Sequence, residues 1–210
     1  IFYIVAAVLF IISLGGLSNQ ESARRGNWFG ILGMLLALIA VTASEEVTAY
    51  GILAVSMFPA VLIGGVLAAR VKMTDMPQLV AILHSFVGAA AVLVGLSLQL
   101  DESKIAHEGI AGIIHNIEIF VGVCIGSITF TGSVIAFGKL QGLISGKPLL
   151  LPARHFLNLI ILVATVWLGM EFVSHNVITD PTTSILIALT LTGILGVHLV
   201  MAIGGADMPV

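Results

Sequence analysis

The sequence predicts an all-α membrane protein, a polytopic helical bundle with about seven transmembrane helices. Apolar residues make up 59% of the 210 positions and charged residues only 9%. The mean hydropathy is +1.16, and the exterior of a soluble domain needs more charge than this. Several apolar runs of roughly 17–25 residues have the length that crosses a bilayer core as a helix. They are continuous rather than alternating, which favours helices over membrane strands.

Seven spans are expected, in chain order, at 1–17, 28–44, 50–69, 78–100, 110–138, 156–174 and 184–203. The first run is closed by the polar segment SNQESARRG, the second by Glu45 and Glu46, and the third by Arg70. The fourth follows Asp-Met-Pro and ends at Asp101, and the fifth ends at Lys139. The sixth follows Arg154, and the seventh follows Asp180. Because the connections are short, residues 1–210 are expected to be one transmembrane domain.

The basic residues orient these spans. Seven of the eight fall in loops on one side, and only Lys104 falls on the other; the seven are Arg24, Arg25, Arg70, Lys72, Lys139, Lys147 and Arg154. Loops rich in Lys and Arg stay in the cytoplasm or its equivalent. The N-terminus is therefore expected outside and the C-terminus in the cytoplasm, or in the matrix of a mitochondrion.

The tripeptide Asp-Met-Pro occurs twice, at 75–77 and at 207–209. Asp suits a helix N-terminus and Pro is tolerated in the first turn, so both copies are consistent with ordinary helix starts. The second copy begins a helix that lies beyond Val210, and the chain starts with Ile1 rather than Met. We therefore expect a fragment of a longer membrane domain, with further helices absent.

A histidine interrupts the fourth span. His84 shares one face of the helix with Gly88, Ala91 and Gly95, which lie 4, 7 and 11 residues further on. Small residues at this spacing let a second helix approach closely. His84 is therefore expected to point into protein rather than lipid.

A longer polar face runs along the fifth span, through His115, Glu118, Gly122, Gly126, Thr129 and Ser133. Ionisable groups inside a membrane are costly and usually face a bundle interior or a wet cavity. One alternative is a small-residue packing seam whose hydroxyls bond back to their own helix. Glu118 and His115, three residues apart, are placed to pair.

Depth relates the two faces. His84 lies six residues after Gln78, and Ser133 lies six residues before Lys139. At 1.5 Å per residue, both lie about 9 Å from the cytoplasmic helix ends. If the two spans pack through their small residues, His84 and Ser133 meet at one level. An imidazole that gains and loses a proton near neutral pH suits proton transfer there.

The remaining polar residues and motifs do not indicate a functional site. His198 is interpreted as a packed or locally hydrogen-bonded residue, and the single cysteine, Cys124, suggests no redox role. No group of His and carboxylate residues has metal-ligand spacing. GSVIAFGKLQG leaves a membrane helix rather than following a strand, so it is not a dinucleotide-binding motif. No bound metal or cofactor, and no nucleic acid, is expected for this chain.

Three stretches carry a specific resemblance: TDMPQLVAILHSFVG, ITFTGSVIAFGKLQGLISGKPLLLPARH and HLVMAIGGADMPV. With them, essentially the whole chain resembles the membrane domain of proton-translocating nicotinamide nucleotide transhydrogenases, in the part that bears the NADP domain. The resemblance implies that proton flow is coupled to hydride transfer between NAD(H) and NADP(H). The two nucleotides are held by soluble domains that this sequence does not contain.

The resemblance also implies roles for residues. His84 matches the family's proton-relay histidine, and Ser133 matches its important helix serine. Asp207 matches an aspartate near the NADP(H) domain, and Lys139 and Arg154 are further candidate contacts to that domain. Glu118, His115 and Thr129 are our candidates for the rest of the proton path. The implied partners are the NAD(H)- and NADP(H)-binding domains, other transmembrane helices, the bilayer, and a second copy of the whole enzyme.

Two other functions fit part of the pattern. A secondary transporter built on repeats would use the Asp-Met-Pro helix entrances at its site. A structural anchor would dock soluble subunits through its basic loops, and it predicts that the polar faces tolerate apolar replacement. The expected location is a bacterial inner membrane, with the mitochondrial inner membrane as the alternative.

Overall fold

The computed structural model describes residues 1–44, 47–101, 109–174 and 180–204, and within them every regular element is helical. The α-helices are α1 (Phe2–Leu17), α2 (Ala23–Thr42), α3 (Tyr50–Arg70), α4 (Met76–Leu100), α5 (Ile110–Leu140), α6 (Arg154–Ser174) and α7 (Pro181–Met201). A short 3₁₀ turn, η1 (Met73–Asp75), leads into α4. The predicted all-α fold class is confirmed, and each of the seven expected spans coincides with a helix.

Six of these helices are long and apolar enough to cross a membrane. The exception, α1, has 16 residues, and at 1.5 Å per residue it is about 24 Å long. The start of α2 differs most from the prediction, because α2 begins at Ala23 rather than at residue 28. Arg24 and Arg25 therefore lie in its first turn and not in a loop. The aliphatic part of an arginine side chain can lie along a helix while the guanidinium stays in water. The apolar run in the sequence is therefore shorter than the helix.

The chain divides into two compact units, Ile1–Arg70 and Val71–Val210. In the first unit, α1 and α2 pack closely through small residues. A Cβ added to Gly16 would lie only 2.7 Å from the Cα of Gly26, so these helix backbones are nearly in contact. No residue of α3 is buried. The assignment of all 210 residues to one transmembrane domain stays a prediction.

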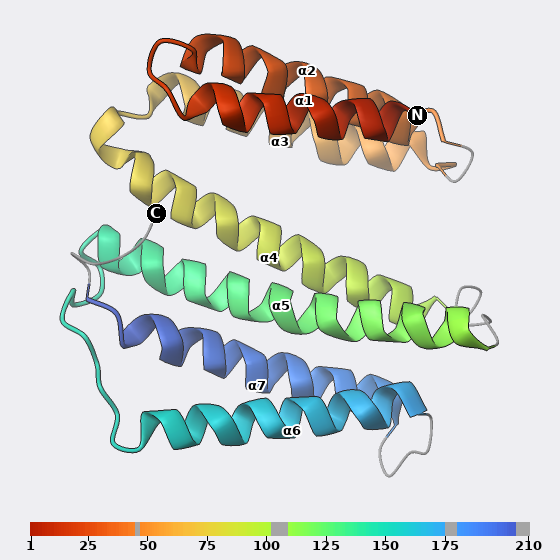
Figure 1. Cartoon of the computed structure of the whole chain (residues 1–210), viewed down its shortest axis with the longest axis vertical. Helices are drawn as coiled ribbons and strands as arrows, with labels where there is room; N and C mark the ends of the chain where they lie inside the picture. The colour runs from red at the N-terminus through yellow and green to blue at the C-terminus, as the bar shows by residue number, and fades with distance from the viewer. Residues whose placement is uncertain (45–46, 102–108, 175–179, 205–210) are drawn as a thin grey trace. The chain divides into compact units, whose positions relative to one another are not determined.

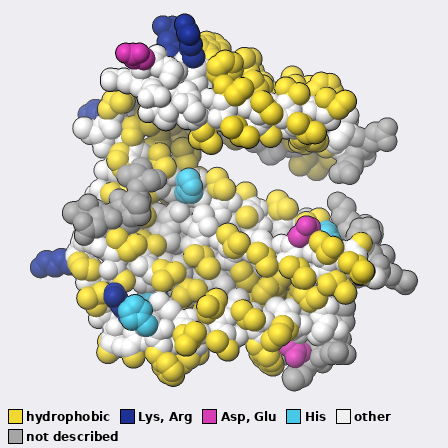
Figure 2. Space-filling view, viewed as in Figure 1, with side chains coloured by type: hydrophobic (Ala, Val, Ile, Leu, Met, Phe, Trp, Pro, Cys, Tyr) yellow, Lys and Arg dark blue, Asp and Glu magenta, His cyan; other side chains and the backbone are white. Residues whose placement is uncertain are grey.

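In the second unit, α5 is the central helix (Figure 1). Its most extensive contact is with α4, the next is with α7, and α6 packs mainly on α7. The apolar core joins α5, α6 and α7 through Ile119, Phe120, Val123, Cys124, Leu168, Phe172, Ile185 and Ala188. Figure 2 shows an apolar surface with Lys and Arg side chains toward one end of this unit, as expected for spans oriented by their basic residues.

The contact between α4 and α5 depends on glycine. A Cβ on Gly88 would lie 2.5 Å from the amide nitrogen of Phe130, and one on Gly126 would lie 2.8 Å from the carbonyl oxygen of Gly88. Any larger side chain at these positions would push the two backbones apart. The predicted close approach along the small residues of the fourth span is thus confirmed.

Two aspartates stand at helix starts. Asp75 is the N-cap residue of α4 and Pro77 lies in the first turn, but the Asp75 carboxylate does not cap the helix. The Asp180 carboxylate does cap α7, since it accepts a hydrogen bond from the amide of Thr183 at 3.2 Å. The second Asp-Met-Pro, with Asp207, lies outside the described residues.

Candidate functional site

His84 lies on α4 at the edge of its contact with α5. Its side chain is exposed, whereas the next residue, Ser85, is buried together with Gly88 and Gly95. The expectation that His84 points into the protein is therefore wrong for the described chain. Successive residues are 100° apart around a helix, and the face that meets α5 is centred between the directions of His84 and Ser85.

The level of His84 along α5 agrees with the sequence prediction. Gly88 packs against Gly126 and Phe130, and Gly95 packs against Ile119 and Val123, so the two helices are antiparallel. The turn of α4 before Gly88, which carries His84, therefore lies level with the turn of α5 after Phe130, which carries Ser133. The two side chains share a depth. No hydrogen bond joins them in the part of the chain that the structure describes.

The polar face of α5 is partly buried and partly open. Gly126 is buried against α4, Glu118 is exposed, and His115, Thr129 and Ser133 are half-buried. Thr129 and Ser133 line a small pocket of about 220 Å³, together with Ile128, Gly132, Ala136, Val200 and Ile203. This pocket opens between α5 and the end of α7.

Helical phase places His84 on the same side of the α4–α5 contact as this polar face. His84 and the α5 face are each rotated by roughly 60° from the centre of the contact. Because the helices are antiparallel, both rotations lead to the same flank. The structure therefore brings His84, Thr129 and Ser133 to one open surface of the unit.

The hydroxyl groups on this surface differ from the others in the unit. Thr165 and Thr192 donate to carbonyls of their own helices, at 2.8 Å to Ile161 and 2.7 Å to Ala188. Ser127 donates across to α7, and Thr131 donates both to α7 and to the carbonyl oxygen of Ser127 in its own helix. Among the described residues, Thr129 and Ser133 make no such bond. The alternative of hydroxyls bonded back to their own helix thus does not describe these two residues.

The three residues expected near an NADP(H) domain have different surroundings. The Lys139 ammonium is buried and donates to carbonyls at the end of α7. Arg154 begins α6, and its Nε donates to Nε2 of His155 at 3.3 Å. Asp207 lies outside the described residues. Contact of these residues with a nucleotide-binding domain stays a prediction.

Comparison with known proteins decides the family. Residues 1–210 match the family described as NAD(P) transhydrogenase beta subunit. The chain belongs to this family. Two curated relatives named NAD(P) transhydrogenase subunit beta, one from Rhodospirillum rubrum and one from a strain of that species, are 46% identical over 211 residues. The match covers 99% of this chain and 44% of each relative, so the chain spans less than half their length.

Membership of the transhydrogenase beta subunit family confirms the resemblance drawn from the three sequence stretches. It also agrees with the apolar helices in describing an integral membrane protein. The alternative of a secondary transporter half is not supported. The roles of His84, Ser133, Glu118, His115 and Thr129 are not decided by family membership alone.

One polar pair of this family member was missed by sequence reasoning. His198 on α7 is buried, and its Nδ1 lies 2.6 Å from the amide oxygen of Asn158 on α6. The expected hydrogen bond of His198 is present, but its partner belongs to another helix. Asn158 was the available signal, since an amide inside an apolar span also needs a partner.

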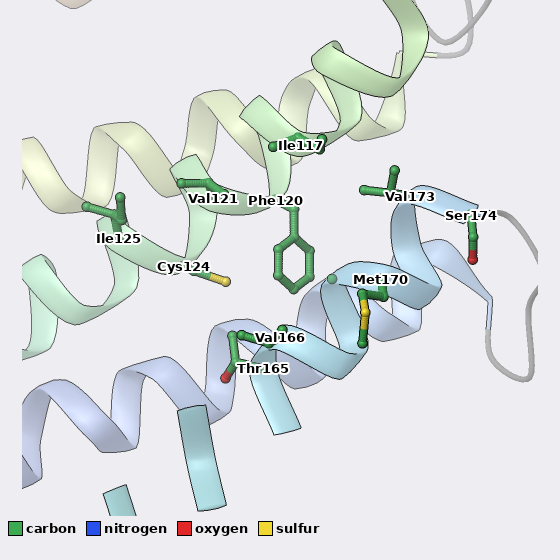
Figure 3. Close-up of a pocket in the computed structure, with 11 residues that line it drawn as sticks. Ile117, Phe120, Val121, Cys124, Ile125, Thr165, Val166, Met170, Val173 and Ser174 are labelled. Atoms are coloured by element: carbon green, nitrogen blue, oxygen red, sulfur yellow. The ribbon is translucent and has the colours of Figure 1, made fainter. Parts of the chain in front are cut away.

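A groove of about 590 Å³ lies between α5 and α6 (Figure 3). Its walls are almost entirely apolar, with Phe120 and Cys124 from α5 and Thr165 and Met170 from α6. The described residues include no group of three or more metal-ligating side chains. This groove shares no lining residue with the pocket of Thr129 and Ser133, and His84 does not line it.

Proposed function

We propose that this chain is the membrane part of a proton-translocating NAD(P) transhydrogenase. In this proposal, proton movement across the membrane is coupled to hydride transfer between NAD(H) and NADP(H). The nucleotides belong to soluble domains outside this sequence, and residues 1–210 form a transmembrane proton-translocating domain of a longer protein. Family membership supports the enzyme class. The observation that carries the residue assignment is the shared open surface of His84, Thr129 and Ser133.

His84 is the proton relay in this proposal. It takes up a proton by a path that involves His115 and Glu118 near the start of α5, then Thr129 and Ser133. Imidazole serves both as acceptor and donor near neutral pH. The exposed position of His84 leaves it open to a further helix of the longer protein, which would enclose the proton path. Hydroxyl groups without a committed partner can relay a proton along such a path.

The energy available is sufficient for coupling. One charge that moves through 100 mV changes the free energy by about 2.3 kcal/mol. This difference is enough to bias a conformational equilibrium by a factor of about ten or more. Protonation of His84 would then be sensed at the cytoplasmic helix ends, by the loop 138–155 and by Asp207, which face the NADP(H)-binding domain.

The proposed partners are the NAD(H)- and NADP(H)-binding domains, the remaining transmembrane helices and a second copy of the whole enzyme. A bacterial inner membrane is the proposed location, with the mitochondrial inner membrane as the alternative. The competing role of a passive anchor would leave the polar surface dispensable, and the following experiment distinguishes the two.

The complete enzyme with His84→Ala is reconstituted into vesicles, and proton translocation is measured together with hydride transfer. We expect a loss of proton translocation by about 100-fold or more, the scale of a lost acid–base group. Phe86→Ala, two residues further along α4 and also exposed, is the matched control and should translocate protons normally. Full proton translocation by His84→Ala would sink the assignment.

The outer half of the path is tested in the same vesicles. Glu118→Gln and His115→Ala should each slow proton translocation, because each removes an ionisable group from the polar face of α5. If both variants couple as well as the unaltered enzyme, this half of the face serves packing only.

A further inference from the structure

The cytoplasmic end of α5 carries a buried cation that the proposed proton path does not use. Lys139 lies in the last turn of α5 and is only 5% exposed. Its Nζ donates to the carbonyl oxygens of Val200 at 3.3 Å, Met201 at 2.8 Å and Ile203 at 2.6 Å. An ammonium group has three N–H donors, and all three are used.

Val200 and Met201 are the last two residues of α7, and Ile203 follows its C-cap residue, Ala202. A helix leaves its last carbonyls without partners inside the helix, and its C-terminus is the negative end of the helix dipole. The C-cap residue of α7, Ala202, keeps a right-handed conformation, so no left-handed residue closes the helix there. The carbonyl of Val200 also accepts from the amide of Ile203 at 3.1 Å, and that of Met201 from the amide of Leu149 at 2.9 Å. Lys139 adds a donor to each of them, donates to the carbonyl of Ile203, and brings a positive charge. A side chain of α5 thus caps α7.

The same end of α5 is also bonded to α4. The Gln78 amide donates to the carbonyl oxygen of Leu140 at 3.2 Å, and the Gln141 amide donates to Oε1 of Gln78 at 2.9 Å. Residues 139–141 therefore join the first turn of α4 to the last turn of α7. His84 lies six residues after Gln78, and Asp207 lies four residues after Ile203.

We propose that Lys139 is a positioning residue for proton coupling, which holds the end of α7, as far as Ile203, in register with the helix that bears Thr129 and Ser133. This inference rests on the proposed function. A junction built only for stability needs no buried charge, because apolar side chains fill such a site at a lower desolvation cost. The charge instead fixes one arrangement of the ends of α4, α5 and α7. This arrangement matters for coupling because α4 carries His84, the proposed relay.

The test uses the complete enzyme in vesicles and measures protons translocated per hydride transferred. Lys139→Met removes the donors and the charge, whereas Lys139→Arg keeps both. We expect Lys139→Met to lower the ratio by about fivefold or more, the usual lower range for coupling between sites. Hydride transfer without a proton gradient should stay close to normal, and Lys139→Arg should restore most of the ratio. Lys72→Met, which removes an exposed lysine on the same membrane side, should change neither quantity.

An unchanged ratio in Lys139→Met would overturn the inference, and so would an equal loss of both activities that Lys139→Arg does not restore. If Lys139→Met does not accumulate in the membrane, Lys139→Gln replaces it, since glutamine keeps two donors without the charge. An unchanged ratio there has the same meaning. His84→Ala in the same vesicles separates the two proposals. If His84→Ala translocates protons normally, the proposed function is refuted. If His84→Ala loses proton translocation but Lys139→Met keeps a normal ratio of protons to hydride, only the role of Lys139 is refuted.

Discussion

The two compact units use the same device for packing but differ in what they bury. In Ile1–Arg70, Gly16 and Gly26 bring α1 and α2 into close contact. In Val71–Val210, Gly88 and Gly126 do the same for α4 and α5. Among the described residues, Ser13 is the one buried polar residue of the first unit, whereas the second buries Ser85, Ser127, Lys139, Thr165, Ser184, Thr192 and His198.

This difference separates two roles of small residues in a membrane protein. In the first unit they permit close packing, and none of the ionisable side chains that the structure describes there is buried with them. In the second they bring together helices that also carry hydrogen-bonding groups, so the contact fixes a polar arrangement. Because polar groups in a membrane are costly, their concentration in the second unit supports the proposal that the proton path lies there.

The largest effect is expected at the contact that carries the proposed relay. Gly88→Leu would place its side chain against the backbone of Phe130 and Gly126, and neither helix can yield locally. We expect a destabilisation of about 3 kcal/mol or more, measured as a lower midpoint of unfolding in detergent. Gly64→Leu in α3 is the control, because nothing lies within 4 Å of the added Cβ. A tolerated Gly88→Leu would show that α4 and α5 do not pack this closely.

A smaller effect is expected at the equivalent contact of the first unit. The Cβ of a Gly26→Leu variant would lie 2.8 Å from backbone atoms of Gly16, Leu17 and Ser13. We expect overpacking to lower the free energy of unfolding by about 1–3 kcal/mol. In the fraction of the protein that folds, the number of protons translocated per hydride transferred should be unchanged. Gly15→Leu, which meets nothing within 4 Å, serves as the control for added bulk on α1. A specific loss of coupling in Gly26→Leu would contradict the separation of roles between the units.

The smallest effect is expected from a single polar contact between helices. Ser127 donates to the carbonyl oxygen of Leu189 at 2.8 Å and so bonds α5 to α7. Ser127→Ala should destabilise the protein by about 0.6 kcal/mol, the average for hydrogen bonds between membrane helices. Thr165→Val removes a bond within one helix and should cost less. Equal losses in the two variants would mean that contacts between helices contribute nothing extra.

Sequence reasoning was most accurate for features that depend on the hydropathy, residue size and rise of a single helix. The spans, the close approach at Gly88 and the common level of His84 and Ser133 follow from hydropathy, residue size and rise per residue. It failed for the direction in which a side chain points, because this depends on the position of a second helix. His84 was expected to face α5, yet Ser85 holds a buried position. Neighbouring residues differ by 100°, and the sequence does not state which direction the partner helix takes.

Lys139 and Asn158 show the same limit. The apolar run ends before Lys139, so the residue was assigned to a loop, but the helix continues to Leu140 and carries the ammonium to the end of α7. The partner of His198 is Asn158, 40 positions away in the sequence. Hydrogen bonds between helices depend on which helices are neighbours, and this order is not written in the periodicity of either helix.

The sequence by itself determined that the chain is a helical membrane protein, where its helices run, which residues share a face, and which family it belongs to. Hydropathy and helical geometry are properties of each segment, so they can be read directly from the residues. Only the tertiary structure decided the choice of neighbours around α5, the open flank shared by His84 and Ser133, and the capping of α7 by Lys139. These features depend on the rotation of each helix against its neighbours, which is set by the packing of the whole unit.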